Sequence, residues 1–311
     1  MNSTNPNAAR LPIEQPILDA AFLRKLEGLS LAARKAFPGQ MKGEKRSIHR
    51  GTSVEFADYR EYTLGDDLRY VDWNLAARLE KLFVKLFVEE EDLYIALLLD
   101  ASASMGFGTP SKLRFAAKVA AAIGYIGMTG YDRVSLTILS NGDHATHGKR
   151  LPGLPPRRGR AAVIPFFRVL NNLTPSGAAA LAQNLRAFAT QTRQRGLAIL
   201  ISDFMDAGWK EGLRALLARG YQIVLVHVLA EEEIHPDLAG DIRILDSETG
   251  DAREMSVTPA LLKRYEAALE AFCTDIRNFA RRAGADYVRA SSGQAFEGIV
   301  LKHLHQAGIV T

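Results

Sequence analysis

LYIALLLDASAS, residues 93–104, is the stretch of this chain that decides its fold. Tyr94 to Leu99 is apolar at every position, whereas a strand with one solvent-facing side would alternate apolar and polar residues. A strand of this kind lies in the centre of a sheet that helices cover on both faces. The apolar run ends at Asp100, where a polar turn begins. We therefore predict an α/β domain with this strand near the middle of its sheet.

The residues after this strand repeat the alternation of helix and strand. A helix from Ser111 to Met128, which Ser111 can cap, leads into a strand from Arg133 to Leu139. Such alternation favours a doubly wound, mainly parallel sheet with helices on both faces and the Rossmann-like strand order 3-2-1-4-5-6. Further along, the pattern predicts helices over 161–171, 178–194, 210–218, 259–282 and 296–306, strands over 197–201, 221–229 and 286–289, and a β-hairpin insertion over 242–245 and 253–257.

The first 92 residues divide into three parts. Residues 1–15 are predicted to be a disordered lead, and an amphipathic helix starts at Pro16 and ends before Pro38-Gly39. Periodicity is then lost from Gln40 to Arg78, after which alternating apolar residues predict a strand over 82–88. We expect residues 16–92, the N-terminal helix and the segment after it, to pack on a main domain formed by residues 93–311.

Composition excludes several classes of protein. With 311 residues, of which 47% are hydrophobic, the chain can bury a core, so disorder is excluded as its main state. A net charge of +4, from interspersed acidic and basic residues, is too small to indicate nucleic-acid binding. The single cysteine, Cys273, excludes a disulfide framework and is expected in the core. No apolar run approaches the ~18 residues of a membrane span and the first residues do not resemble a signal peptide, so we expect a cytoplasmic protein.

Hard oxygen ligands gather at two predicted strand ends. Asp100, Ser102 and Ser104 alternate in the turn after the central strand, so their side chains can face one point. The strand over 197–201 ends in Ser202-Asp203, which neighbours Asp100 if the two strands are adjacent, as in the predicted order. Carboxylate and hydroxyl oxygens suit Mg²⁺ or Mn²⁺, so we predict a divalent-cation site at Asp100, Ser102, Ser104 and Asp203. The alternative is that these residues only cap the helices that follow.

Together with the residues upstream, this pattern is similar to that of a known family. An apolar strand that runs into D-x-S-x-S, with a later strand ending in S-D, resembles the metal-ion-dependent adhesion site of von Willebrand factor A-type domains. The upstream residues resemble the bacterial family catalogued as domain of unknown function fifty-eight (DUF58), and the resemblance extends from about Gly43 to Leu229. The residues that carry it are Arg46-Ser47, Gly51 to Phe56, Tyr59 to Tyr62, Gly65 to Asp67, Arg69, Val71 to Trp73, Ala77-Arg78, Val84-Lys85 and Glu90.

The resemblance implies a von Willebrand A-like fold and a role in protein interaction. Domains of this type bind partners by letting an acidic side chain complete the coordination shell of the cation, and family members commonly accompany MoxR-type AAA+ ATPases. It therefore implies a non-enzymatic adaptor that acts with such an ATPase in the assembly or activation of client proteins. The resemblance assigns Asp100, Ser102 and Ser104 to the first metal loop and Asp203 to the third.

The second metal loop departs from the family pattern. The domain type supplies a threonine from a Gly-Gly-Thr turn, whereas this chain has Ala178 or Ala179 there, after Thr174-Pro175-Ser176-Gly177. Thr174, Ser176 or water could take the position, since Mg²⁺ readily retains waters. Without any of these the site is weaker.

The charged segment from Arg60 to Arg78 has two interpretations. Its carboxylates and arginines could form a docking surface for a partner. Alternatively, arginine–carboxylate pairs fix an irregular segment in which Tyr70 and Trp73 are buried. We favour the structural interpretation.

A metal-dependent phosphoester hydrolase is the alternative function. Asp100, Asp203 and Asp206 could hold a cation that activates water. The sequence contains no P-loop and no G-x-S-x-G, so neither nucleotide hydrolysis by that loop nor a nucleophile-elbow serine is indicated. We interpret Glu231 to Glu233 as solvated. In the Pro/Arg-rich loop over 151–160, the cluster Arg157-Arg158-Gly159-Arg160 could bind a phosphate or an acidic partner, but we favour an ordinary solvated loop.

Overall fold

The chain folds into two compact units. The α/β unit comprises residues 1–37 and 93–311, and the hairpin unit comprises residues 38–92. This computed structural model describes residues 17–27, 29, 31, 54–79, 81–89, 93–140, 150–245 and 251–304. The N-terminal residues belong to the α/β unit, although the hairpin unit separates them from it along the chain.

A six-stranded sheet in the order β10-β7-β6-β3-β4-β5 forms the centre of the α/β unit. Numbered along this sheet alone, the order is the predicted 3-2-1-4-5-6, and every neighbouring pair is parallel except β4 with β5. The doubly wound, mainly parallel sheet is therefore confirmed. Its strands are β3 (Tyr94–Asp100), β4 (Arg133–Leu139), β5 (Gly153–Arg157), β6 (Leu197–Ser202), β7 (Gln222–Leu229) and β10 (Asp286–Ser291).

The edge strand β5 corrects the prediction of a solvated loop over 151–160. It pairs antiparallel with β4, with Leu154 opposite Leu136. Pro155 and Pro156 have no backbone N–H to donate, but proline is tolerated in a strand that has a neighbour on one side only. Pairing with β4 therefore forms a strand that the sequence pattern does not predict.

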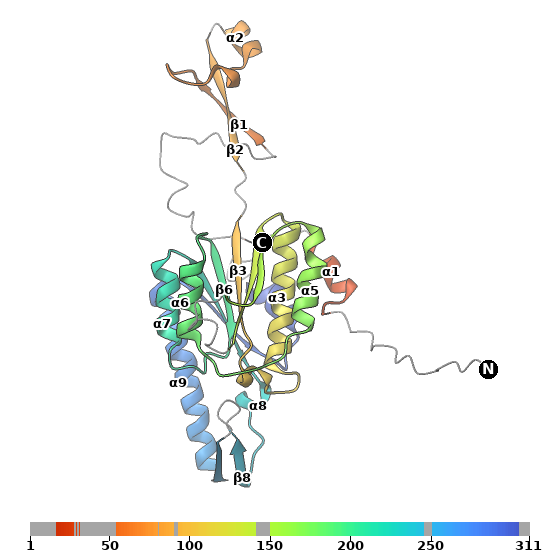
Figure 1. The fold of residues 1–311 in the computed structure, drawn as a ribbon, viewed down its shortest axis with the longest axis vertical. Helices are drawn as coiled ribbons and strands as arrows, with labels where there is room; N and C mark the ends of the chain where they lie inside the picture. Colours follow the sequence, from red (N-terminus) through yellow and green to blue (C-terminus); the bar gives the residue numbers. More distant parts are fainter. Residues whose placement is uncertain are drawn as a thin grey trace, which may run out of the picture. The chain divides into compact units, whose positions relative to one another are not determined.

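Helices cover both faces of this sheet (Figure 1). One face packs against α1 (Ala20–Leu26), α3 (Lys112–Thr129) and α5 (Val163–Asn171), and the other against α6 (Leu181–Gln191), α7 (Trp209–Ala218) and α9 (Pro259–Ala283). No helix among the described residues is both long and apolar enough to cross a membrane. The smaller elements are η2 (Ala103–Gly106), η3 (Arg160–Ala162), α8 (Glu231–Ile234), α10 (Phe296–Gly298), the π-helical η4 (Ile299–Leu304), and β8 (Gly240–Leu245) and β9 (Ala252–Val257), which form the predicted hairpin.

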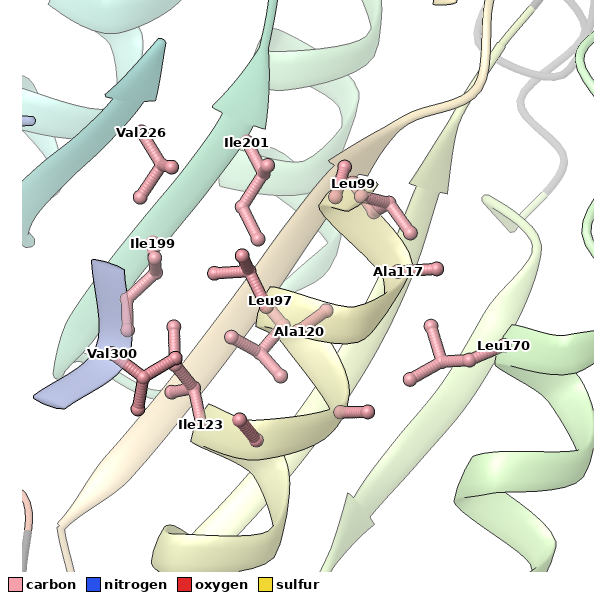
Figure 2. Packing of buried hydrophobic residues seen from close by; sticks show 14 of the residues in the cluster. Leu97, Leu99, Ala117, Ala120, Ile123, Leu170, Ile199, Ile201, Val226 and Val300 are labelled. Carbon is pink, nitrogen blue, oxygen red and sulfur yellow. The ribbon is translucent and has the colours of Figure 1, made fainter. Parts of the chain in front are cut away.

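The central strand β3 is buried along its whole length and joins the two halves of the core. Leu97 and Leu99 point to the face covered by α3, and Figure 2 shows them beside apolar side chains of that helix. Ala96 and Leu98 belong to the cluster on the opposite face, with residues of α6 and α7. Both faces of β3 therefore contribute to the core, as its sequence predicts.

The N-terminal helix is shorter than predicted. Asp19 caps α1 by accepting the N–H of Phe22 at 2.6 Å, and the backbone becomes extended at Glu27. Phe22 packs edge-on against Phe296, with ring centroids 4.9 Å apart. The helix was predicted to continue as far as Pro38, but it ends at Leu26, and its buried residues are Phe22 and Leu26. Residues 1–16 and 32–38 lie outside the described residues.

The hairpin unit contains regular structure where the periodicity is lost. β1 (Val54–Glu61) pairs antiparallel with β2 (Phe83–Glu89), and η1 (Leu68–Tyr70) and α2 (Trp73–Leu79) lie between them in the chain. The prediction of an irregular segment over 40–78 is therefore wrong for β1 and α2. β1 is a strand because β2 supplies its backbone partners, a contact that a single window of sequence does not show.

The predicted arginine–carboxylate pairs of this unit are present. Arg60 binds Asp66 with two bonds of 2.8 Å, and Arg69 binds Asp67 at 2.6 Å. The predicted burial of Trp73 is wrong, because its side chain is 60% exposed. Val71 and Val84 are buried, whereas Trp73, at the start of α2, faces solvent.

Leu97→Ala tests how far the fold depends on β3. Leu97 is 0% exposed against α3, so truncation leaves a cavity, and we expect the free energy of unfolding to fall by about 3 to 5 kcal/mol. The control is Leu238→Ala, at a side chain that is 45% exposed, which should cost about 0.5 kcal/mol or less. Urea unfolding followed by circular dichroism measures both. Equal losses would contradict the central position of β3.

Candidate functional site

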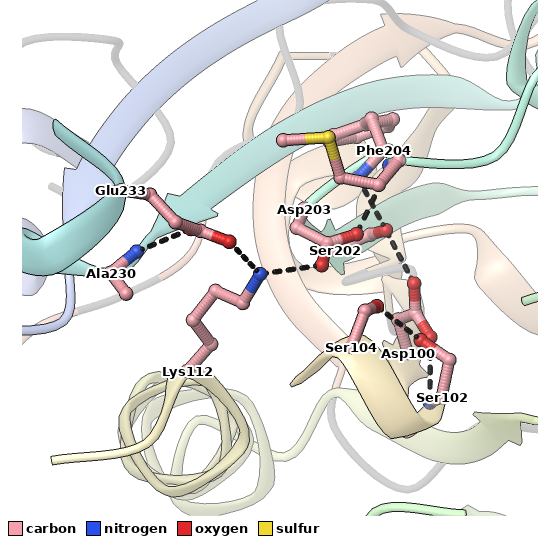
Figure 3. A network of polar contacts seen from close by, with 10 residues as sticks. Asp100, Ser102, Ser104, Lys112, Ser202, Asp203, Phe204, Ala230 and Glu233 are labelled. Carbon is pink, nitrogen blue, oxygen red and sulfur yellow. Dashed lines mark hydrogen bonds and ion pairs between the residues drawn. The ribbon is translucent and has the colours of Figure 1, made fainter. Parts of the chain in front are cut away.

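The carboxyl ends of β3 and β6 place Asp100 and Asp203 in one buried cluster (Figure 3). The two strands are adjacent and parallel, with Leu99 opposite Ile201. Ser202, the last residue of β6, donates its hydroxyl proton to Asp100 Oδ2 at 2.5 Å. The Ser102 N–H donates to Asp100 Oδ1 at 3.0 Å. The adjacency that the predicted strand order requires is therefore present.

Ser102 and Ser104 lie close together in the turn after β3. Their hydroxyl oxygens are 3.1 Å apart and share a hydrogen bond. Ser102 is buried and Ser104 is half-buried. Although Ser102 stands directly before η2, its side chain makes no capping hydrogen bond there. Helix capping therefore does not account for this serine.

A buried lysine completes the cluster. Lys112, the first residue of α3, is 1% exposed, and its ammonium donates to Asp203 Oδ2 at 2.7 Å and to Glu233 Oε1 at 2.6 Å. Glu233 Oε2 accepts the N–H of Ala230 at 2.8 Å. Figure 3 shows the ammonium between the two carboxylates, with Asp100 and the serines beyond Asp203. The ion pairs connect α3, the turn after β6 and α8.

Negative charge is in excess in this cluster. Lys112 faces Asp203 and Glu233, whereas Asp100 accepts hydrogen bonds from neutral donors. Burial, together with the charge of Asp203, raises the pKa of Asp100 to about 6. Burial alone would lower the pKa of Lys112, but the carboxylates of Asp203 and Glu233 outweigh it and raise that pKa. The lysine therefore stays charged and is engaged away from Asp100.

Thr174 and Ser176, the candidates for the second metal loop, are exposed. Their loop is attached to the turn after β3 by two backbone hydrogen bonds of 2.9 Å, from Ser176 N to Ala101 O and from Ala103 N to Gly177 O. The loop therefore lies beside the turn that carries Ser102 and Ser104.

Asp206 has a different role. It accepts the N–H of Leu181 at 2.6 Å and that of Gly208 at 2.5 Å. Leu181 is the first residue of α6, so Asp206 fixes the start of that helix against the turn after β6. These contacts leave two carboxylates, Asp100 and Asp203, at the paired strand ends.

His227 of β7 is buried against the ring of Phe204, which follows Asp203. Its Nδ1 shares a 2.9 Å hydrogen bond with the hydroxyl of Tyr287, and Nε2 has no partner among the described residues. Burial lowers the pKa of His227 to about 4, against the attraction of Asp203. A histidine that is neutral at pH 7 adds no positive charge to the cluster.

The sequence prediction omits Lys112 and misplaces Glu233. Glu231 to Glu233 was interpreted as solvated, but the Glu233 side chain is 16% exposed and binds Lys112. Lys112 continues a helical stripe of buried apolar residues, Ala116, Val119 and Ile123. A lysine is seldom buried unless it is paired, so its position in that stripe is the signal that could have located it.

Part of the cluster fits a small divalent cation. Adjacent ligands of an octahedral Mg²⁺ lie about 2.9 Å apart, close to the 3.1 Å between the Ser102 and Ser104 hydroxyl oxygens. Asp203 is less available than Asp100, because the ammonium of Lys112 already neutralises it, whereas Asp100 accepts hydrogen bonds from neutral donors only. Across the residues that the structure describes, no group of three or more His, Cys, Asp or Glu side chains is placed to hold a metal. A cation here would therefore depend on Asp100, serine hydroxyls and water.

A family model described as "Protein of unknown function DUF58" matches residues 58–272, which include the whole cluster. The chain is 32% identical over 286 residues to "Uncharacterized protein Rv1480" of Mycobacterium tuberculosis, across 90% of this chain and 86% of the relative. The same values hold for "Uncharacterized protein Mb1516" of Mycobacterium bovis. The family match and these relatives both cover most of the chain.

Solved structures similar to the chain include three bacterial proteins. The conserved hypothetical protein BatB of Bacteroides thetaiotaomicron is 17% identical, with a TM-score of 0.43 over 70% of this chain and 98% of that one. The pilus adhesin SpaC of Lactobacillus rhamnosus GG, in its open conformation, is 11% identical, with a TM-score of 0.46 over 72% and 31%. A von Willebrand factor type A protein of Catenulispora acidiphila is 14% identical, with a TM-score of 0.32 over 59% and 43%. Because these TM-scores lie below 0.5, the solved structures are not used as an argument for the fold. The fold class is instead established by the strand order of this chain.

Lys112→Met tests the buried ion pairs. Removing the ammonium leaves the carboxylates of Asp203 and Glu233 buried without a cation, so we expect the free energy of unfolding to fall by about 3 to 5 kcal/mol. The matched control is Lys210→Met, because Lys210 pairs with Asp275 on the surface and should cost about 1 kcal/mol or less. Urea unfolding at pH 7.5 measures both variants. A Lys112→Met loss no larger than that of the control would contradict the buried network.

Asp100→Asn tests the electrostatics of the strand end through pH. The pKa of Asp100 is about 6 when folded and 3.8 ordinarily, so between these values the folded state binds a proton that the unfolded state has released. This carboxyl therefore lowers the free energy of unfolding as pH rises from about 4 to 6. The asparagine cannot ionise, so the variant should gain stability relative to wild type over that range. Urea unfolding in EDTA at pH 4.5 and 7.5 measures the difference, and a difference that stays constant would be evidence against the shift.

Proposed function

The chain belongs to the DUF58 family, and from this premise we propose that it is a non-enzymatic protein-interaction module with a divalent-cation site at the carboxyl end of β3. Asp100, Ser102 and Ser104 hold Mg²⁺ or Mn²⁺ in this proposal. When bound, the cation supplies positive charge to which an acidic side chain of a partner protein can coordinate. The protein's own residues position that cation and keep its inner side dry.

The observation that carries the proposal is the buried carboxylate of Asp100. It is fully enclosed and has no cationic partner among the described residues, while two hydroxyl oxygens lie in the turn that follows it. A buried carboxylate without a counter-ion is costly, so a cation that neutralises it gains more there than at the surface. The spacing of the serine oxygens suits adjacent ligands of Mg²⁺.

Asp203 contributes from outside the coordination shell in this proposal. The ammonium of Lys112 already neutralises Asp203 and would repel a cation bound to the same carboxylate, so Asp203 acts through its charge or through a water. The position that the family fills with threonine is taken by water or by Thr174 or Ser176, whose exposed loop is attached beside the turn. The outer side of the cation therefore remains open to a partner.

A MoxR-type AAA+ ATPase is the partner that the family resemblance supports. The sequence has no P-loop, so energy from nucleotide hydrolysis by such a loop has to come from another protein. We propose that the module acts in the cytoplasm and links this ATPase to a client protein. An acidic side chain of one of them binds the cation, and the client is then assembled or activated.

The alternative function, phosphoester hydrolysis, has less support from the contacts. A cation held by three carboxylates needs Asp206, which instead fixes the start of α6. It also needs Asp203, which the ammonium of Lys112 already neutralises.

Calorimetric titration of Mg²⁺ and of Mn²⁺ into metal-stripped protein tests the cation site. We expect saturable binding to wild type and its loss in Asp100→Asn, because the amide carries no charge to offset the dehydration of the ion. The matched control is Asp275→Asn, which removes an exposed carboxylate of the same kind and should bind like wild type. Added Mg²⁺ should also raise the melting temperature of wild type but not of Asp100→Asn.

Two outcomes would contradict the proposal. The cation site is wrong if wild type and Asp100→Asn bind the ions equally or not at all. The non-enzymatic role is wrong if the protein hydrolyses p-nitrophenyl phosphate and Asp203→Ala abolishes that turnover. Capture of an ATPase by wild type but not by Asp100→Asn, in the presence of Mg²⁺, supports the partner.

A further inference from the structure

The hydroxyl of Ser202, the last residue of β6, is enclosed in the protein and makes two hydrogen bonds. Its oxygen accepts the N–H of Phe204 at 2.9 Å and lies 2.5 Å from Asp100 Oδ2. A serine hydroxyl has one proton to donate, and a backbone N–H can only donate. The proton of Ser202 therefore points at Asp100, whose carboxylate accepts it.

The Asp100 carboxylate is held at both of its oxygens. Oδ2 accepts the hydroxyl of Ser202, and Oδ1 accepts the N–H of Ser102 at 3.0 Å. Figure 3 shows the two bonds reaching Asp100 from different sides. The Ser102 bond is local, two residues along the chain, whereas Ser202 lies 102 residues away on the neighbouring strand. The Ser202 bond therefore ties the orientation of the carboxylate to the pairing of β6 with β3.

Phe204, which supplies the N–H to Ser202, has a left-handed backbone. Its φ is +58°, a conformation that residues other than glycine seldom adopt. Its ring is 0% exposed and packs edge-on against the rings of Trp209 and His227, with centroid distances of 6.1 and 5.5 Å. These contacts hold the residue in place despite its unfavourable backbone. The core thereby sets the direction of the Phe204 N–H, and through it that of the Ser202 proton.

Ser291 makes the same two kinds of bond at the end of β10. Its hydroxyl donates to Glu231 Oε2 at 2.6 Å and accepts the N–H of Gly293 at 3.2 Å. The Glu231 side chain is 52% exposed, so water reaches that residue and can replace a lost donor. Asp100 is only 1% exposed, so its carboxylate has no such replacement. The hydroxyl bond therefore matters more to Asp100 than to Glu231.

A small divalent cation depends on the orientation of this carboxylate. Mg²⁺ demands near-ideal octahedral geometry, so a carboxylate that turns about its Cβ–Cγ bond misplaces the oxygen that it offers. The hydroxyl oxygens of Ser102 and Ser104, 3.1 Å apart, define the other two protein ligands. Groups that hydrogen-bond a metal ligand without touching the metal commonly change metal affinity by roughly ten- to a hundredfold.

We propose that Ser202 is a positioning residue of the cation site, because it fixes the Asp100 carboxylate in the orientation in which Asp100, Ser102 and Ser104 can share one cation. This inference rests on the proposed function. Phe204 takes part through its N–H, which directs the Ser202 proton to the carboxylate. The alternative is that Ser202 only stabilises the turn after β6, which predicts lower stability of Ser202→Ala without a change in cation affinity.

Calorimetric titration of Mg²⁺ into the metal-stripped full chain tests this role. Ser202→Ala removes the hydroxyl, and we expect Mg²⁺ to bind at least roughly tenfold more weakly. The matched control is Ser291→Ala, which removes the same two kinds of bond from another buried strand end and should bind within about twofold of wild type. Ser202→Thr restores the donor and should recover binding to within about threefold of wild type.

Urea unfolding in EDTA verifies that each variant is folded under the conditions of the titration, so that a loss of affinity does not report unfolding. If Ser202→Ala does not fold, Ser202→Cys replaces it, because a thiol is a weaker donor and should give weaker binding than Ser202→Thr. Binding by Ser202→Ala within about twofold of wild type, or equal losses in Ser202→Ala and Ser291→Ala, would overturn this proposal alone. A wild type that binds no Mg²⁺ would overturn the cation site and this proposal with it.

Discussion

The ion pair of Lys112 with Asp203 is the interaction on which the carboxyl edge of the sheet depends. Its ammonium reaches carboxylates that are 91 and 121 residues away along the chain, and all of these groups are largely withdrawn from water. A buried charge is tolerated only when its partners are correctly placed, so the turn after β6 and α8 must both meet the first turn of α3. The same edge carries Asp100, whose surroundings are thereby fixed.

Because of this arrangement, Asp100 and Asp203 have different electrostatic surroundings, although each lies at the carboxyl end of a buried strand. Asp203 follows β6 and has an internal cation, while Asp100 ends β3 and accepts hydrogen bonds from the hydroxyl of Ser202 and an N–H. The lysine cannot serve both, because its position is set by Glu233 on the other side. Asp100 is therefore the group that a cation from solution would neutralise, and Asp203 is the group that holds the fold together around it.

The sequence predicts those parts of the structure that depend on consecutive residues. Burial on both faces of β3 and the alternation of Asp100, Ser102 and Ser104 can be recognised in one short stretch of sequence. The strand order could be predicted because few topologies are compatible with alternating strands and helices. Lys112 and Glu233 could not be paired in this way, since their contact exists only after folding. The strand β5 was missed for a related reason, because β4 holds it in the sheet despite its prolines.

The carboxyl edge offers a ligand carboxylate a directional mode of binding. In the proposed function the carboxylate would be bound by coordination to a cation, which excludes water from that contact. Asp100 ends a strand that is buried along its whole length, and Ser202 ends a neighbouring strand that is equally buried. The sheet therefore fixes the position of the Asp100 carboxylate, and a cation bound to it would be fixed with it.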